Sequence, residues 1–199
     1  VGCSKGMGSQ MSKLVDFVVV GAQRSGTTWL YEMLKQHPQI ALGRKEVSFF
    51  NDVASSYVYE SIRNYEKGVS WYEQQIPQIK EKLSGDFSAN YLFDPIAAER
   101  MARDIPEAKV IVILREPASR AVSQFRLASQ YFFIGDDLRE AVKRHPDIIE
   151  RGKYYDQLRR FYDLFAPEQI LVLIFEDIKR DPVQVLERVE TFLGIRRYI

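Results

Sequence analysis

The feature that most constrains the fold is an apolar run that leads into a glycine-bounded loop and then into a helix-forming segment. Residues 17–20 read Phe-Val-Val-Val, and Gly21 and Gly26 enclose the four residues that follow the run. From residue 27 onward, apolar residues recur at helical spacing. A strand, a tight loop and a helix N-terminus in this order direct backbone N–H groups at one point, which is an arrangement that binds anions. The segment therefore predicts a phosphate cradle.

The loop has the spacing of the nucleotide-binding motif G-x-x-x-x-G-K-S/T but lacks its lysine. Thr27 stands where that motif has the lysine that reaches the β- and γ-phosphates. Its loss argues against ATP or GTP chemistry, and Arg24 inside the loop supplies a cation instead. The expected ligand is a nucleotide whose 5′ end is not a triphosphate.

Two motifs resemble those of the sulfotransferases that use 3′-phosphoadenosine 5′-phosphosulfate (PAPS). The family's 5′-phosphosulfate loop reads K/R-S/T-G-T-T, and residues 24–28 are Arg-Ser-Gly-Thr-Thr. The family's 3′-phosphate motif is a strand that ends in arginine, with a serine eight residues later, as in Arg115 and Ser123. The resemblance runs from about residue 16 to residue 195 and is closest to the heparan-sulfate (Golgi) and related bacterial branch.

The pattern of apolar segments predicts an α/β fold. Strands are expected at residues 17–20, 85–88, 110–114 and 170–175, and helices at residues 27–36, 95–104, 117–129, 154–165 and 182–193. The strands are almost continuously apolar, as in parallel sheets that are buried on both faces. We therefore expect a single three-layer α/β/α domain with a central parallel sheet, similar to that of P-loop NTPases. Both phosphate motifs follow strand ends, so they should face one crevice.

Length and composition suit one globular domain. The chain has 199 residues and a formal net charge of +1, which gives no overall attraction to nucleic acid. No apolar run approaches the ~20 residues of a membrane span. Residues 1–12 are interpreted as a flexible or cloning-derived leader, and residues 13–199 as the domain. Family members continue into a Lys/Gly/Arg-rich loop that completes the 3′-phosphate site, and this loop is expected to be missing here. A cytoplasmic location is expected if the source is bacterial.

The resemblance implies that PAPS is the cofactor, with adenosine 3′,5′-bisphosphate as product and no metal. The 5′ end would be bound by Gln23, Arg24, Ser25, Gly26, Thr27, Thr28 and Trp29, and the 3′-phosphate by Arg115 and Ser123. The threonine hydroxyls could also cap the helix, and Trp29 could either stack on adenine or belong to the core. Arg120 and Arg126 lack the family spacing and are expected to be solvated or ion-paired.

Glu46 and Arg24 are the candidate catalytic residues. Heparan-type enzymes place a catalytic glutamate in E-V-x-F-F, and residues 46–50 are Glu-Val-Ser-Phe-Phe. A carboxylate with an ordinary pKa is a weak base, so Phe49 and Phe50 are expected to shield Glu46 from water. Arg24 would stabilise the departing phosphate without donating a proton, since arginine stays charged. The lysine that many relatives carry before Ser-Ala-x-Tyr is Phe87 in this chain.

The resulting hypothesis is transfer of a sulfuryl group from PAPS to a hydroxyl or amine of a small molecule or carbohydrate. Two alternatives remain open at this point. One is a P-loop nucleotide kinase or NTPase, which would need the missing lysine and an acidic residue in place of Arg115. The other is a protein that binds adenosine 3′,5′-bisphosphate without turnover.

Overall fold

A five-stranded parallel sheet forms the centre of the molecule. The computed structural model describes residues 13–52 and 63–198, so the leader expected at residues 1–12 lies outside the described residues. The strands are β1 (Phe17–Gly21), β2 (Ile40–Leu42), β3 (Leu83–Phe87), β4 (Lys109–Leu114) and β5 (Ile170–Ile174), in the spatial order β2-β3-β1-β4-β5. The predicted α/β/α fold with a central parallel sheet is confirmed.

Strand β1 lies between β3 and β4 and pairs with both in parallel. Val19 is opposite Phe87 on one side and Ile111 on the other. All five residues of β1 are buried, because helices cover both faces of the sheet. The segments that follow β1, β3 and β4 therefore meet at one edge of the sheet, as the positions of the two phosphate motifs require.

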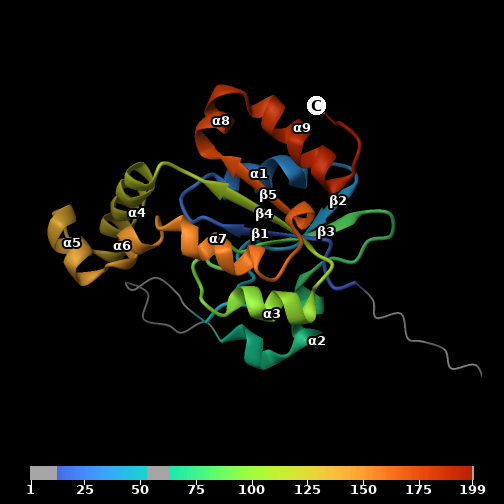
Figure 1. The fold of residues 1–199 in the computed structure, drawn as a ribbon, viewed down its shortest axis with the longest axis horizontal. Coiled ribbons are helices and arrows are strands. Elements are labelled where there is room, and N and C mark those ends of the chain that lie inside the picture. Colours follow the sequence, from blue (N-terminus) through green and yellow to red (C-terminus); the bar gives the residue numbers. More distant parts are fainter. Residues whose placement is uncertain (1–12, 53–62, 199) are drawn as a thin grey trace, which may run out of the picture.

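The helices form two layers on the sheet and a third group beyond the carboxyl ends of the strands (Figure 1). One layer contains α1 (Thr27–Lys35), α8 (Phe175–Arg180) and α9 (Pro182–Leu193), and the other α2 (Val69–Gln75), α3 (Ala97–Asp104) and α7 (Tyr154–Tyr162). The outer group is α4 (Pro117–Phe132), α5 (Leu138–Arg144) and α6 (Asp147–Glu150). Two short 3-10 helices, η1 (Asn64–Lys67) and η2 (Pro167–Gln169), complete the described elements.

Helix α9 begins and ends at the predicted residues. The Asp181 side chain accepts a hydrogen bond from the Gln184 amide at 3.0 Å and so caps its first turn. Gly194 follows the helix at φ 77°, a left-handed conformation that glycine adopts without steric cost. None of the helices in residues 13–52 and 63–198 is long and apolar enough to cross a membrane.

Several short elements were not predicted: β2, α2, α5, α6 and α8. Strand β2 has three residues and α6 has four, which is too short for a period to be recognisable. The expected strand at residues 170–175 instead ends at Ile174, because Phe175 begins α8. Helix α4 runs three residues further than predicted, to Phe132, and α7 ends earlier, at Tyr162.

Candidate active site

The loop between β1 and α1 turns tightly and delivers the start of α1 to the carboxyl edge of the sheet. Gly26 is the N-cap of α1 and has φ 97°. A Cβ at Gly26 would lie 2.9 Å from the Phe175 ring, so this position requires glycine both for its conformation and for space. Arg24, two residues earlier, also has a left-handed backbone, with φ 69°.

The cradle offers hydrogen-bond donors that suit a phosphate. No side chain caps α1 at Gly26, so the first-turn amides of this helix keep their donors available. The Arg115 Nε is buried and has no hydrogen-bond partner among the described residues. A helix N-terminus and an unpaired guanidinium N–H on the same side of a crevice fit a nucleotide phosphate or phosphosulfate.

The predicted 3′-phosphate motif, Arg115 and Ser123, contacts the loop that carries Arg24. The Nε of Arg24 donates a hydrogen bond to Ser123 Oγ at 3.2 Å. Arg115 donates to the backbone carbonyl of Arg24 at 3.1 Å, and its guanidinium lies 4.6 Å from the centre of the Phe175 ring. Residues that are 91 and 99 positions apart in the chain are thus in contact. The Glu116 side chain caps α4, so any 3′-phosphate contact would come from side chains and not from this helix N-terminus.

Glu46 lines the same crevice. Its Oε2 accepts a hydrogen bond from the Ala89 amide at 3.1 Å, and its Oε1 lies 3.4 Å from Lys45 Nζ. The same ammonium donates to Thr28 Oγ1 at 2.7 Å. Lys45 therefore connects the carboxylate to the first turn of α1. Glu46 is placed next to the cradle, where a base for an acceptor group is needed.

The surroundings of Glu46 raise its pKa above the ordinary value. Desolvation by the protein is the largest cause, and the charge of Lys45, the Ala89 amide and the charge of Arg151 partly offset it. The side chain is still 41% exposed, so a substrate can reach the carboxylate. A raised pKa makes the carboxylate a stronger base, as general-base catalysis requires.

Two adjoining cavities connect these groups. A cavity of about 350 Å³ is lined by Gln23, Arg24, Gly26, Thr27, Thr28, Lys45, Glu46, Ala89, Arg115, Ser123, Leu127 and Phe175. A second cavity of about 490 Å³ shares Arg24, Arg115, Ser123 and Leu127 with the first and continues along α4 past Ser119 and Arg126. Three cations and one carboxylate line the first cavity, so it favours an anionic ligand. No group of three or more potential metal ligands occurs within residues 13–52 and 63–198.

Comparison with known proteins identifies the family. The model of the sulfotransferase domain matches residues 14–197 of this chain. The chain belongs to the sulfotransferase family. This sulfotransferase is 30% identical, over 204 residues, to human bifunctional heparan sulfate N-deacetylase/N-sulfotransferase 3. It is 31% identical, over 206 residues, to mouse bifunctional heparan sulfate N-deacetylase/N-sulfotransferase 4. Each match covers 92% of this chain but only 22% of the relative, so the chain spans about a fifth of the length of these curated relatives.

Solved structures agree with this assignment. A sulfotransferase from Alicyclobacillus acidocaldarius superposes on this one with a TM-score of 0.77 at 30% identity, covering 92% of this chain and 81% of that chain. Mouse sulfotransferase SULT7A1, crystallised with PAP, superposes with a TM-score of 0.61 at 20% identity, covering 94% of this chain and 60% of that chain. The second likeness supports the fold alone. The predicted sulfotransferase family is confirmed.

Eight of the ten predicted site residues of this sulfotransferase line the first cavity. The two that do not are Ser25, which is fully buried, and Trp29, which is partly buried and packs against the core on the α1 side of the sheet. Neither threonine of the loop caps α1. Of the two alternatives for Trp29, stacking on adenine or packing in the core, its position fits the second.

One expectation about neighbouring residues is wrong, and one of the two alternatives for another residue is excluded. Phe49 and Phe50 do not line the cavity with Glu46, because both are buried in the core on the α2 side of the sheet. Of the two alternatives for Arg120, solvated or ion-paired, the structure excludes the first. It is fully buried and donates to Gln124 Oε1 at 2.6 Å and to the carbonyl of Ile148. Helices α5 and α6 were not predicted from the sequence. Their apolar side chains pack against α4 in one buried cluster, and this packing covers Arg120.

Two cations of the site were not predicted from the sequence. Lys45 immediately precedes Glu46, and an adjacent Lys-Glu pair is more often solvated than functional, so the sequence carried only a weak signal for it. Its ammonium donates to Thr28 and supplies a cation in the crevice. Arg126 was expected to be a solvated helix residue. It is exposed, but it lines the second cavity three positions after Ser123 on α4.

Proposed function

We propose that this domain transfers a sulfuryl group from PAPS to a hydroxyl or amine of an acceptor, and that the acceptor is a carbohydrate. The observation that carries this proposal is the contact between the two motifs, in which Arg24 donates to Ser123 and Arg115 donates to the Arg24 carbonyl, in a cavity that Glu46 also lines. Two anion-binding groups and a base in one crevice suit a donor with phosphates at both ends and an acceptor that must lose a proton.

Each side chain has a role that follows from its position. When bound, the donor supplies the sulfuryl group and leaves as adenosine 3′,5′-bisphosphate. Arg24 and the first turn of α1 stabilise negative charge at the 5′ end, and Arg115 with Ser123 holds the 3′-phosphate. Glu46 accepts the proton that the acceptor oxygen or nitrogen releases as its bond to sulfur forms. Lys45 keeps Glu46 close to the cradle through its contact with Thr28.

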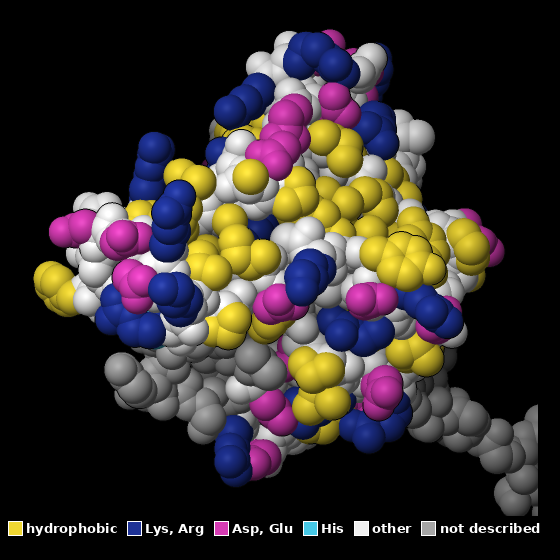
Figure 2. Space-filling view, turned by 60° about the vertical axis from the view of Figure 1, so that its left-hand side comes forward, with side chains coloured by type: hydrophobic (Ala, Val, Ile, Leu, Met, Phe, Trp, Pro, Cys, Tyr) yellow, Lys and Arg dark blue, Asp and Glu magenta, His cyan; other side chains and the backbone are white. Residues whose placement is uncertain are grey.

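The carbohydrate acceptor is proposed from the relatives, which are named as heparan sulfate N-sulfotransferases. The end of the molecule that carries α4, α5 and α6 shows basic and acidic side chains interspersed among hydrophobic ones, without one broad basic face (Figure 2). A sulfated or carboxylated chain would therefore meet local cations at the crevice, such as Arg126. Such an acceptor would have to reach Glu46, which lines the first cavity.

The non-catalytic alternative has less support. A protein that only held adenosine 3′,5′-bisphosphate would have no need of a carboxylate with a raised pKa beside the 5′-phosphate site, since a negative charge there opposes phosphate binding. The kinase alternative is disfavoured by the family match and by Thr27 in place of the cradle lysine.

Arg115→Ala is expected to discriminate between two nucleotides. The variant should bind adenosine 3′,5′-bisphosphate about 10–100-fold more weakly, because one charge-assisted contact to the 3′-phosphate contributes ~1.5–3 kcal/mol. The affinity for adenosine 5′-phosphate should fall much less. The expected small loss arises because Arg115 also donates to the Arg24 carbonyl and so helps to hold the 5′-phosphate loop. Isothermal titration calorimetry with both ligands, in EDTA, measures the two affinities.

The matched control is Arg159→Ala, which removes an arginine that is 65% exposed on α7. This control should bind both nucleotides as the unmodified protein does. Equal losses for the two ligands in Arg115→Ala would show that Arg115 does not bind the 3′-phosphate. Tighter binding of ATP–Mg²⁺ than of the bisphosphate by the unmodified protein would contradict the proposed function itself.

A further inference from the structure

Asp86, the fourth residue of β3, is a carboxylate that lies inside the protein with three hydroxyl groups around it. It is 1% exposed. Its Oδ2 accepts hydrogen bonds from Tyr91 at 2.8 Å and Tyr72 at 3.1 Å, and its Oδ1 accepts from Ser88 Oγ at 2.8 Å. Asp86 forms no ion pair with the residues that the structure describes. A buried carboxylate held only by neutral donors is costly to keep, so its retention needs an explanation.

Two of these hydroxyls also contact the segment of residues 46–50, which begins at Glu46. Ser88 Oγ accepts the Ser48 amide at 3.0 Å, and the Tyr91 hydroxyl accepts the Phe49 amide at 2.9 Å. Each hydroxyl has a single hydrogen, which points at Asp86 because its oxygen faces an amide donor. The carboxylate thus fixes the direction of both hydroxyls and, through them, binds two consecutive amides just after Glu46.

The segment needs such support, because its backbone is strained. Glu46 has φ 58° and Ser48 has φ 52°, and neither is glycine. Left-handed backbones at ordinary residues cost energy and persist only where the surroundings determine them. The Glu46 amide is also held, by the carbonyl of Phe87 at 2.7 Å. Strand β3 and the turn after it therefore bind three of the four amides from Glu46 to Phe49.

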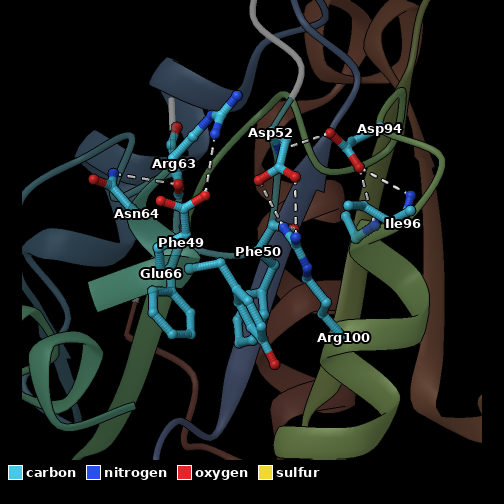
Figure 3. A network of polar contacts seen from close by, with 12 residues as sticks. Phe49, Phe50, Asp52, Arg63, Asn64, Glu66, Asp94, Ile96 and Arg100 are labelled. Atoms are coloured by element: carbon cyan, nitrogen blue, oxygen red, sulfur yellow. Dashed lines mark hydrogen bonds and ion pairs between the residues drawn. The ribbon is translucent and has the colours of Figure 1, made fainter. Parts of the chain in front are cut away.

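The carbonyl side of the same segment is held by a different set of residues (Figure 3). Asn64 donates to the carbonyls of Val47 and Ser48 at 2.9 and 3.3 Å, and Arg100 donates to that of Phe50 at 3.0 Å while it pairs with Asp52. These contacts anchor the segment but do not touch the Ser48 and Phe49 amides. Among the described contacts, those that hold the Ser48 and Phe49 amides come from the Asp86 network.

We propose that ionised Asp86 is a positioning residue, which holds the Glu46 carboxylate in the crevice by fixing the hydroxyls of Ser88 and Tyr91. The catalytic meaning of this proposal rests on the proposed function, but its structural content does not. A protonated Asp86 carries a hydrogen on one oxygen, and that oxygen becomes a donor and a weaker acceptor of the hydrogen bond from its hydroxyl neighbour. One of the two connections to the segment then weakens, and the backbone just after Glu46 is held less firmly, although the Ala89 amide and Lys45 still contact the Glu46 carboxylate.

The titration of Asp86 falls in a range that experiments reach. Burial raises the pKa of Asp86 to about 6, the bonds from Ser88, Tyr91 and Tyr72 oppose the rise, and the charge of Glu46 adds to it. The other titratable groups that face Asp86 are the two tyrosines, whose pKa values burial raises well above 10, so they stay protonated donors. Because the pKa of Asp86 is raised on folding, acidification through pH 6 does not unfold the protein through this group. The expected change is local.

The two tyrosines provide a matched pair of variants. Both hydroxyls bond the same oxygen of Asp86, but only that of Tyr91 also bonds an amide of the segment. Tyr91→Phe and Asp86→Asn should speed hydrogen exchange of the Ser48 and Phe49 amides about tenfold or more, whereas Tyr72→Phe should leave it close to that of the unmodified protein. Exchange measured by NMR between pH 5 and 8, corrected for intrinsic rates, should show protection falling below pH about 6 in the unmodified protein.

Turnover adds a second readout. Misplacing a reacting group by about 1 Å costs about 100-fold in rate. Asp86→Asn and Tyr91→Phe should therefore lower kcat by up to about 100-fold. Their affinity for adenosine 3′,5′-bisphosphate should stay within about twofold of that of the unmodified protein. Unchanged Ser48 and Phe49 protection in Asp86→Asn, or equal effects of Tyr72→Phe and Tyr91→Phe, would overturn the inference. Absence of sulfuryl transfer in the unmodified protein would contradict only the proposed function, because the exchange measurement does not depend on turnover.

Discussion

The Glu46→Gln variant is expected to lose sulfuryl transfer by about 10²–10⁴-fold, the range for removal of a general base. Glutamine keeps the size of the side chain, and its oxygen can still accept the Ala89 amide that now holds Glu46. It cannot take a proton at neutral pH. Because Glu46 belongs to neither phosphate motif, binding of adenosine 3′,5′-bisphosphate should persist. Initial rates and calorimetry on the same preparation measure both effects.

The pH profile gives an independent check on Glu46. Its pKa is raised by desolvation, and the reaction needs the ionised form, so the rate should rise with pH through a value above that of a free glutamate. The small residual rate of Glu46→Gln should lack this rise with pH. Any pH dependence that remains in the variant would come from the titration of Asp86. Glu73→Gln, an exposed change on α2, is the control and should behave as the unmodified protein does. Unimpaired transfer by Glu46→Gln would show that another group takes the proton.

Arg24→Ala is expected to lower the rate by about 10²–10³-fold, as for loss of one donor that stabilises charge in the transition state. The variant also loses the bond to Ser123, which joins the two phosphate motifs. Its affinity for both adenosine 5′-phosphate and the bisphosphate should therefore fall, in contrast to Arg115→Ala, which affects mainly the second ligand. Rates and the two dissociation constants together distinguish these patterns.

Arg24→Lys is the informative companion of this variant. Lysine keeps the positive charge in the cradle but cannot present the planar group that reaches Ser123 and the crevice together. We expect it to recover a large part of the rate that alanine loses, since the charge at the departing phosphate is the main requirement. An Arg24→Ala variant with normal turnover would contradict the role of Arg24, and equal rates for alanine and lysine would show that charge is not what Arg24 contributes.

The long elements of the fold could be predicted from the sequence because each carries a strong local signal. Strands β1 and β4 are continuous β-branched and aliphatic runs, and α9 begins at a capping Asp181 before proline and ends at Gly194. Elements such as β2, α6 and α8 carry no comparable signal. They form because the sheet and α4 provide surfaces on which they pack, and a short segment does not reveal such tertiary contacts.

The candidate site was predictable where a motif fixes the backbone. The cradle at residues 22–28 and the positions of Arg115 and Ser123 follow from strand ends that share one edge of the sheet. The surroundings of Glu46 were not predictable, because they depend on side chains from three segments. Phe49 and Phe50 point into the core, and the crevice beside Glu46 is instead formed by Lys45, Ala89 and the cradle. The buried network of Asp86 likewise appears only when β3, α2 and the Glu46 segment are packed together.

The central claim is that one crevice binds PAPS and passes its sulfuryl group to a carbohydrate. It is tested most directly by incubating the protein with ³⁵S-labelled PAPS and N-desulfated heparin in EDTA, and by measuring polymer-bound label and released adenosine 3′,5′-bisphosphate together. We expect equal amounts of the two, formed without metal and abolished in Glu46→Gln. Release of the bisphosphate without labelled polymer would contradict the carbohydrate acceptor, and no release with any hydroxyl or amine acceptor would contradict the proposed reaction.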